Sequence, residues 1–191
     1  MSVKASTAKK AATYADIEAL PDHVVGELIA GELIVSPRPT PRHAHSASSL
    51  SMKLGPPFHF GDGGPGGWWI LFEPELHLGG DVVVPDLAGW RRERLPTLPT
   101  SAWFELSPDW VCEVISPSTA RVDRAAKLPV YARERVGHVW LVDPDARTVE
   151  ILRRQEQTYL MVAVHSGNET VRAEPFDAID LDLSAIWGET G

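Results

Sequence analysis

Several features that would assign a chain to a specialised class of protein are missing from this sequence. It has one cysteine, Cys112, among 191 residues, so it can form no internal disulfide and no cysteine-rich zinc site. No apolar run approaches the ~20 residues that a transmembrane helix needs. The first residues, MSVKASTAKKAA, lack the apolar stretch of a secretory signal. We therefore expect a soluble protein of the cytoplasm.

Positive charge is also in short supply. Lys and Arg number 18 against 26 Asp and Glu, which gives a net charge of −8. This balance argues against a globally basic nucleic-acid-binding protein, although it does not exclude a local basic surface. No G-x-S-x-G or P-loop pattern occurs. Zinc is not expected either, because His43 and His45 have no cysteine or third histidine nearby.

The length and composition fit one globular domain. Hydrophobic residues make up 43% of the chain and charged residues 23%, as in ordinary globular proteins. Residues 1–12 are small, polar and basic, and we expect them to form a disordered leader. The rest of the chain, residues 13–191, shows no internal repeat and no domain boundary.

The order of apolar runs and turn residues predicts an α+β (α/β) fold, with a central mixed β-sheet flanked by helices. Helices are expected over residues 14–20, 43–54, 123–135 and 182–187. Strands are expected over residues 33–35, 68–78, 81–90, 110–116, 138–144, 147–154 and 158–164, the last two as a hairpin. We expect the strands near 82–88 and 110–116 to be neighbours. The Pro-rich segment 37–42 and the Gly/Pro-rich segment 55–67 are expected to be loops, the second one mobile.

One acidic residue interrupts an apolar run. Glu113 lies in WVCEVIS (110–116), a stretch typical of a strand buried on both faces, and alternation puts it on the same face as Ile115. An ionised carboxylate is costly there unless it is paired or binds a metal. Glu113 therefore indicates either a metal site or a buried ion pair with Arg121 or Arg124.

A second acid, Asp86, follows Pro85 in the strand-like segment VVVPDLAGW. Two carboxylates on adjacent strands can hold one Mg²⁺ through their oxygens. The metal can then activate water and stabilise charge on a phosphate. A PD pair followed by a distant acid is by itself a weak signal, because such combinations occur often by chance.

The surrounding segments make that signal more specific. GELIAGELIVSP, PRHAHS, VVVPDLAGW, VCEVISPST, D-x-x-x-K-L-P-x-Y and VWLVDP follow one another in this order. The series resembles the Uma-two family of restriction endonucleases, which belongs to the PD-(D/E)xK nuclease superfamily. The resemblance covers roughly residues 14–155 and leaves 156–191 as a C-terminal extension. It implies a restriction-endonuclease-like core and a single nuclease-like domain over residues 13–191.

The resemblance also implies roles for individual residues. Asp86 matches the metal-binding Asp of the PD motif, and Glu113 matches the acid of the (D/E)xK strand. The backbone carbonyl of Val114 is implied as a further metal ligand. Ile115 stands where the motif has its lysine, so the sequence departs from the pattern there. The resemblance suggests that Lys127, on the following helix, supplies the ammonium, and a solvated helix lysine is the alternative.

Other positions match the family or lie near the motif. Glu27 and Glu32 match two acids of the first conserved segment, and Glu27 is the stronger candidate for the site. Either could instead be a surface side chain. His43 stands at the family's histidine position, where it could contact a phosphate or act as a structural donor. Asp123 is expected to be a helix N-cap.

The leading functional hypothesis is an endonuclease that hydrolyses phosphodiester bonds with Mg²⁺ or Mn²⁺, with DNA as the expected substrate. Trp68 and Trp90 are weak candidates for stacking on a base. Arginine and lysine side chains near the motif could contact phosphates: Arg91, Arg92, Arg94, Arg121, Arg124 and Lys127.

Two alternatives remain. One is a non-catalytic nucleic-acid or protein binding module that retains the nuclease fold, which the isoleucine at position 115 favours. The other is a structural protein in which Glu113 pairs with an arginine. A homodimer is also expected, because enzymes that cut both strands of a duplex often pair two active sites across a two-fold axis.

Overall fold

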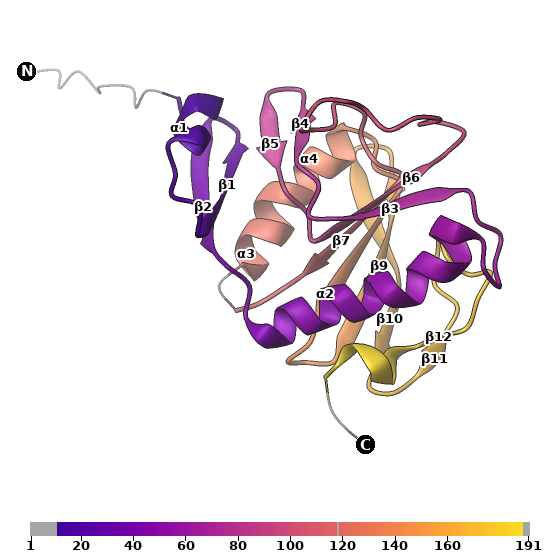
Figure 1. Ribbon diagram of the computed structural model, residues 1–191. Coiled ribbons are helices and arrows are strands. Elements are labelled where there is room, and N and C mark those ends of the chain that lie inside the picture. The colour runs from indigo at the N-terminus through magenta and orange to yellow at the C-terminus, as the bar shows by residue number, and fades with distance from the viewer. Residues whose placement is uncertain (1–10, 118, 189–191) are drawn as a thin grey trace, which may run out of the picture.

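Two β-sheets organise the part of the chain that the computed structural model describes, residues 11–117 and 119–188 (Figure 1). The larger has the strand order β10-β9-β8-β7-β6-β3 and the smaller β2-β1-β5-β4. The strands of the larger sheet are β3 (Trp68–Phe72), β6 (Leu87–Arg91), β7 (Trp110–Val114), β8 (His138–Asp143), β9 (Thr148–Gln155) and β10 (Thr158–Ser166). Those of the smaller sheet are β1 (Val24–Ile29), β2 (Glu32–Pro37), β4 (Leu76–Leu78) and β5 (Asp81–Val83). A separate short pair consists of β11 (Thr170–Val171) and β12 (Leu181–Asp182).

The larger sheet is mixed, as the sequence predicts. β7 and β8 run parallel, with Glu113 opposite Leu141, and the other neighbouring strands are antiparallel. Parallel neighbours need a crossover connection, which the helical segment 120–133 provides here. The predicted pairing of the strands near 82–88 and 110–116 is confirmed only in part. β6 pairs with β7, whereas β5 belongs to the smaller sheet.

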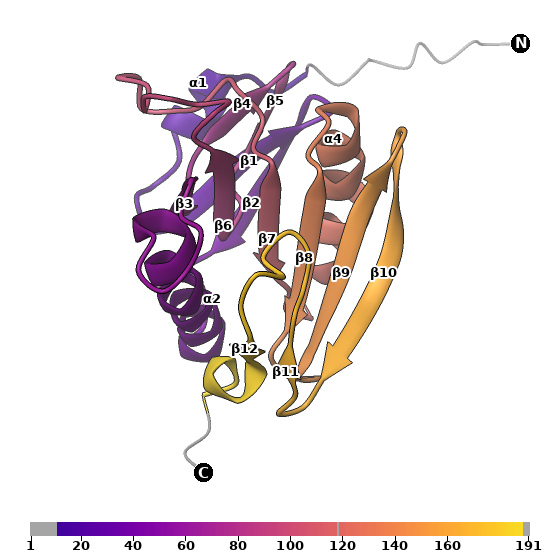
Figure 2. The ribbon, with the colours of Figure 1, turned by 90° about the vertical axis from the view of Figure 1, so that its right-hand side faces the viewer.

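Helices cover both faces of the larger sheet (Figure 2). One face carries α3 (Ala120–Val122), the π-helical turn η2 (Asp123–Lys127) and α4 (Leu128–Arg133). The other carries α2 (Pro41–Leu54), the π-helical turn η1 (Gly55–Phe60) and the 3₁₀-helix η3 (Leu183–Ile186). Alternation along β7 produces this two-sided burial: Cys112 and Val114 pack on the α2 side, and Val111 and Ile115 pack on the α4 side.

The predicted helix over residues 123–135 is a longer helical segment with an irregularity inside it. It starts at Ala120 and ends at Arg133, and Leu128 donates its N–H to the carbonyl of Asp123, five residues back. Pro129 follows at once and has no N–H to donate. The widened turn therefore directly precedes the point where proline interrupts regular helical bonding.

Two long predicted strands, 68–78 and 81–90, are each split between the two sheets. The first breaks around Pro74, next to Glu73 with its positive φ of 44°, and the second breaks around Pro85. Proline cannot donate to a strand ladder, so the chain leaves one sheet there and enters the other. Their apolar patterns continue across the break, which is why the sequence alone suggests single strands.

Other predicted boundaries also differ from the structure. The predicted strand at 33–35 belongs to the hairpin β1–β2, which turns at Ala30 and Gly31, both with positive φ. Helix α2 begins at Pro41, inside the predicted loop, because proline is well suited to a first helical turn. The N-terminal helix α1 is shorter than expected, Tyr14–Glu18, and the last predicted helix is the 3₁₀ turn η3.

The Gly/Pro-rich segment 55–67 is only partly a loop, contrary to expectation. Its first half forms η1, and Phe58 is fully buried, 4.6 Å from the ring of Phe176. Trp68 and Trp90, considered as base-stacking residues, are also buried and belong to the core. Residues 55–60 are therefore helical, although their composition is typical of a loop.

The chain beyond residue 156 contributes to the main core. Phe176, Leu181, Ile186 and Trp187 are buried against the α2 side of the larger sheet. The predicted leader falls largely on residues 1–10, which lie outside the described residues. Among the described residues, no helix combines the length and apolarity needed to span a membrane.

Phe176 offers a test of this C-terminal contribution. Its ring lies 4.6–5.7 Å from those of Phe58, Trp68, Trp110 and Trp140. Phe176→Ala should lower the free energy of unfolding by about 3–5 kcal/mol, because it leaves a cavity among large side chains. Urea denaturation measures the change. The matched control is Phe60→Ala, since Phe60 is 72% exposed, and an equal loss in both variants would contradict this role.

Candidate active site

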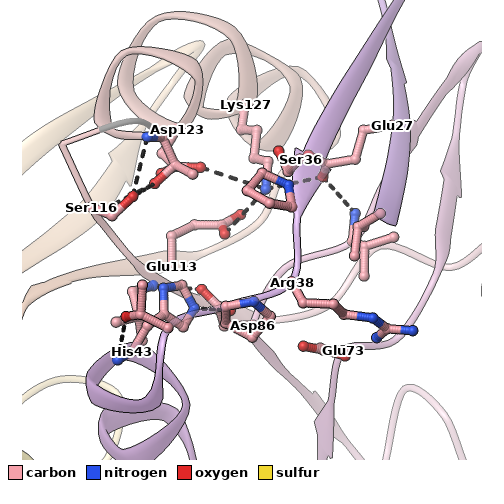
Figure 3. A pocket seen from close by; sticks show the side chains of 17 residues that line it. Glu27, Ser36, Arg38, His43, Glu73, Asp86, Glu113, Ser116, Asp123 and Lys127 are labelled. Carbon is pink, nitrogen blue, oxygen red and sulfur yellow. Dashed lines mark hydrogen bonds and ion pairs between the residues drawn. The ribbon is translucent and has the colours of Figure 1, made fainter. Parts of the chain in front are cut away.

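A pocket lies where β7 ends, between the hairpin β1–β2, the start of α2 and the turn η2 (Figure 3). Elements far apart in the sequence therefore direct side chains to one place. The ionisable groups among its lining residues are Glu27, Arg38, His43, Glu73, Asp86, Glu113, Asp123 and Lys127.

The ammonium group of Lys127 is surrounded by three carboxylates. Its Nζ lies 2.9 Å from Glu27 Oε1, 3.2 Å from Glu113 Oε2 and 3.5 Å from Asp123 Oδ1. Only 5% of Lys127 is exposed, so the alternative of a solvated helix lysine is wrong. A buried charge is tolerated when it is paired, and here the acids outnumber the ammonium.

Two of these acids are fixed by further hydrogen bonds. Glu27 Oε1 also accepts the N–H of Val84 at 2.8 Å, in the connection between β5 and β6. Glu113 Oε1 accepts the hydroxyl of Tyr131 at 2.5 Å, so its two oxygens have different partners. Lys127 and Tyr131 stand four residues apart on the helical segment and therefore reach the same strand.

The excess of negative charge shifts the pKa values in the pocket. Burial raises the pKa of Glu113 well above its usual range, and the charges of Asp123, Asp86 and Glu27 add to this while Lys127 opposes it. Burial likewise raises the pKa of Asp123. For Lys127, burial lowers the pKa but the charges of the three acids outweigh it, so the ammonium keeps its proton. Lys127 therefore stays charged, while the pocket favours the protonated forms of Glu113 and Asp123 more than water does.

Asp86 lies at the other side of the pocket and is held at both oxygens. Oδ2 accepts the N–H of Val114 at 2.7 Å, and Oδ1 lies 2.6 Å from His43 Nε2. Burial lowers the pKa of His43, but the hydrogen bond and the charge of Asp86 outweigh it and leave this pKa raised. The site thus has a second ionic contact, between the start of α2 and the residue that precedes β6.

The donor set of this pocket suits a hard cation such as Mg²⁺ or Mn²⁺. It combines carboxylate oxygens with the backbone carbonyl of Val114. A divalent ion would also relieve the mutual repulsion among the acids. Among the described residues, however, no three Asp, Glu, His or Cys side chains already surround one point. Binding a metal would therefore require a carboxylate, such as that of Glu113, to exchange one of its present partners.

Most of the site residues predicted from the sequence line this pocket. Asp86, Glu113, Val114, Lys127 and Glu27 line the same pocket, and so does His43. Glu32, by contrast, is exposed at the end of β2 and does not line this pocket.

Two residues of the site were not identified from the sequence. Asp123 was expected to be an N-cap, but it is buried inside the helical segment and faces Lys127. Tyr131 ends the segment D-x-x-x-K-L-P-x-Y, which by itself assigns the tyrosine no role. The spacing 123, 127, 131 puts all three residues on one helix face, and this periodicity in D-x-x-x-K-L-P-x-Y was the signal that could have found them.

Most of the arginine side chains near the motif contact other side chains of the protein. Glu113 contacts Lys127 and Tyr131. Arg121 is exposed and Arg124 pairs with Glu150, so the predicted alternative of a buried Glu113–arginine pair is not supported. Arg94 pairs with Asp109, while Arg91 and Arg92 stack on Trp68 and Trp69. These residues therefore give little support to a phosphate-binding surface.

The raised pKa of Glu113 predicts a pH dependence of stability. Its folded-state pKa lies above its unfolded value, so the stability it confers is fully present below about pH 4 and is lost as the pH rises through the folded pKa. In Glu113→Gln this titration is absent. The variant should thus gain stability relative to the parent between pH 5 and 8, by at most about 1.4 kcal/mol per pH unit.

Denaturation in chelator-treated buffer at several pH values measures this difference. Glu32→Gln, at an exposed acid, is the matched control and should show no such gain. A constant difference between Glu113→Gln and the parent across this range would refute the electrostatic description of the pocket.

Two of three comparisons with known proteins give a match. A comparison with curated proteins gives no match. A crystal structure from Anabaena variabilis ATCC 29413, described as a putative nuclease belonging to DUF820, is similar in fold with a TM-score of 0.70. The likeness covers 92% of this chain and 97% of that one at 22% sequence identity. The model of the Uma2 family, described as "Putative restriction endonuclease", matches residues 12–184. The chain therefore belongs to the Uma2 family of nuclease-like proteins, as the series of sequence motifs implies.

Proposed function

We propose that this protein is a metal-dependent endonuclease that hydrolyses phosphodiester bonds in DNA with Mg²⁺ or Mn²⁺. The observation that carries the proposal is the pocket itself, which Asp86, Glu113 and Lys127 line together with Val114. Membership of the Uma2 family supports the same reaction class. The expected cytoplasmic location stays a prediction.

Asp86 and Glu113 are the residues that would hold the metal, with the carbonyl of Val114 as a further oxygen ligand. In an extended strand the N–H and C=O of one residue point to the same side. Since the N–H of Val114 donates to Asp86, we expect its carbonyl on the same side of β7 as that carboxylate. When bound, the ion would activate a water molecule and stabilise charge on the phosphate.

Lys127 would act on the attacking water or on the developing phosphate charge. A superfamily lysine two residues after the acid would stand at Ile115, which shares the strand face of Glu113 and is buried against the helical segment. Lys127 approaches Glu113 from that same segment. Glu27 and Asp123 would keep its ammonium in place if Glu113 turned toward a metal, because each contacts it independently.

One arginine near the pocket supports a polyanionic substrate. Arg38 lines the pocket and donates a hydrogen bond to the carbonyl of Asp22, whereas Arg42, in the first turn of α2, is half exposed and pairs with Asp145. His43, which lines the same pocket, already contacts Asp86. A nucleic-acid backbone entering here would meet positive charge before it reached the carboxylates.

A non-catalytic binding module that retains the nuclease fold is the second candidate function. The observation that favours it is the engagement of both Asp86 oxygens and both Glu113 oxygens by protein groups. Metal binding without cleavage of any DNA form would support it. A homodimer stays a prediction, and light scattering that gives a mass of ~21 kDa at micromolar concentration would contradict it.

A cleavage assay tests the proposed nuclease. Single- and double-stranded DNA are incubated with Mg²⁺ or Mn²⁺, and the wild-type protein should cut at least one of them. Asp86→Asn and Glu113→Gln should each lower the rate more than about 100-fold, beyond the 10–100-fold loss typical when only an outer partner of a metal ligand is removed.

Asp62→Asn, at an exposed loop position, is the matched control and should cut as the wild type does. Equal activity in Asp86→Asn and Asp62→Asn would contradict the proposed role of Asp86 in metal binding. Any cleavage that persists in chelator would argue for a contaminating enzyme or for a different reaction mechanism.

A further inference from the structure

We propose that Tyr131 is a positioning residue for the carboxylate of Glu113. Its hydroxyl holds Oε1, which leaves Oε2 as the oxygen that can exchange its lysine partner for a metal. This inference rests on the proposed function, because it concerns how Glu113 becomes a metal ligand. It adds a role that neither the motif nor the family match assigns.

The contact is made from behind the pocket. Tyr131 is fully buried and is not among the residues that line the pocket, whereas Glu113 is. The hydroxyl therefore meets Oε1 on the protein side, inside the hydrophobic cluster between α4 and the sheet. Val136 donates its N–H to the carbonyl of Tyr131, which fixes the end of the helix that carries the ring.

The two oxygens of Glu113 differ in how replaceable their partners are. Tyr131 is the partner of Oε1, at 2.5 Å, and its buried hydroxyl would lose its hydrogen bond if Oε1 moved away. Oε2 contacts Lys127 at 3.2 Å, and Lys127 has two other carboxylates within 3.5 Å. Releasing Oε2 therefore leaves the ammonium paired, whereas releasing Oε1 leaves a buried hydroxyl unpaired.

Packing alone does not account for this hydroxyl. A phenylalanine would occupy the same apolar cluster and would bury no polar group. Replacing buried polar partners by apolar groups of similar shape is often neutral or stabilising, so a tyrosine–carboxylate pair in a core is weak evidence for a purely structural role. Hydrogen bonds to ligating carboxylates are, in contrast, a recurrent feature of metal sites, because they fix the orientation of the ligand.

The first test compares Mn²⁺ binding by calorimetry in Tyr131→Phe and Tyr159→Phe. Tyr159 is the matched control because its hydroxyl donates to the carbonyl of Val136, at 2.8 Å, without contacting the pocket. Tyr131→Phe should weaken Mn²⁺ binding about tenfold or more, the range found when an outer partner of a metal ligand is removed. Tyr159→Phe should change it less than about twofold. Equal affinities in the two variants would overturn the inference.

A second measurement needs no substitution at residue 131 and so does not depend on the variant folding. The chain has three tyrosines, so labelling their ζ-carbons with ¹³C gives few NMR signals to assign. Tyr159→Phe and Tyr14→Phe identify two of them. Addition of Mg²⁺ should move the Tyr131 signal, because charge on Glu113 is then shared with the ion, and should leave the Tyr159 signal in place. A Tyr131 signal that stays fixed at saturating Mg²⁺ would overturn the inference.

Failure of this inference can be told apart from failure of the proposed function. A wild-type protein that binds no Mn²⁺, or binds it unchanged after Asp86→Asn, contradicts the metal site and the role of Tyr131 together. A wild-type protein that binds Mn²⁺ through Asp86, combined with an unaffected Tyr131→Phe, contradicts the role of Tyr131 alone.

Discussion

The burial of one ammonium group among three carboxylates is the constraint on which the rest of this structure depends. Lys127 comes from η2, Glu27 from the small sheet and Glu113 from the large sheet, and Asp123 lies one helical turn before Lys127. A buried charge is costly unless it is paired, so the ammonium and the carboxylates favour one another's burial. The cluster therefore joins three elements at the pocket.

Backbone irregularities put the site's side chains in position. Pro85 ends the path of the chain along the small sheet, so that Asp86 stands at the entrance to β6 and can accept the N–H of Val114. Pro129, in the first turn of α4, follows the π-helical turn that carries both Asp123 and Lys127. Such turns occur often at functional sites, because they alter the direction of side chains without breaking a helix. Local irregularity and long-range charge pairing thus act on the same few residues.

The sequence predicts which residues line the pocket better than it predicts the elements that carry them. A lone acid in an apolar run is a strong local signal, so Glu113 could be identified from its neighbours. The split of residues 81–90 between two sheets could not, because its apolar pattern is continuous and only long-range pairing separates β5 from β6. Asp123 was assigned as an N-cap on local grounds, and its burial beside Lys127 depends on contacts with Glu27 and Glu113, which are distant in the sequence.

The departure at Ile115 has a mechanical consequence for this site. A lysine two residues after Glu113 on the same strand would be held near it by the backbone itself. Lys127 reaches Glu113 from a helical segment that packs on the sheet through side chains such as Val130 and Tyr131. The distance between acid and ammonium then depends in part on the packing of the hydrophobic cluster beneath α4. In this chain the contact between Glu113 and Lys127 is therefore linked to the stability of that cluster, and substitutions in the core beneath α4 should alter both.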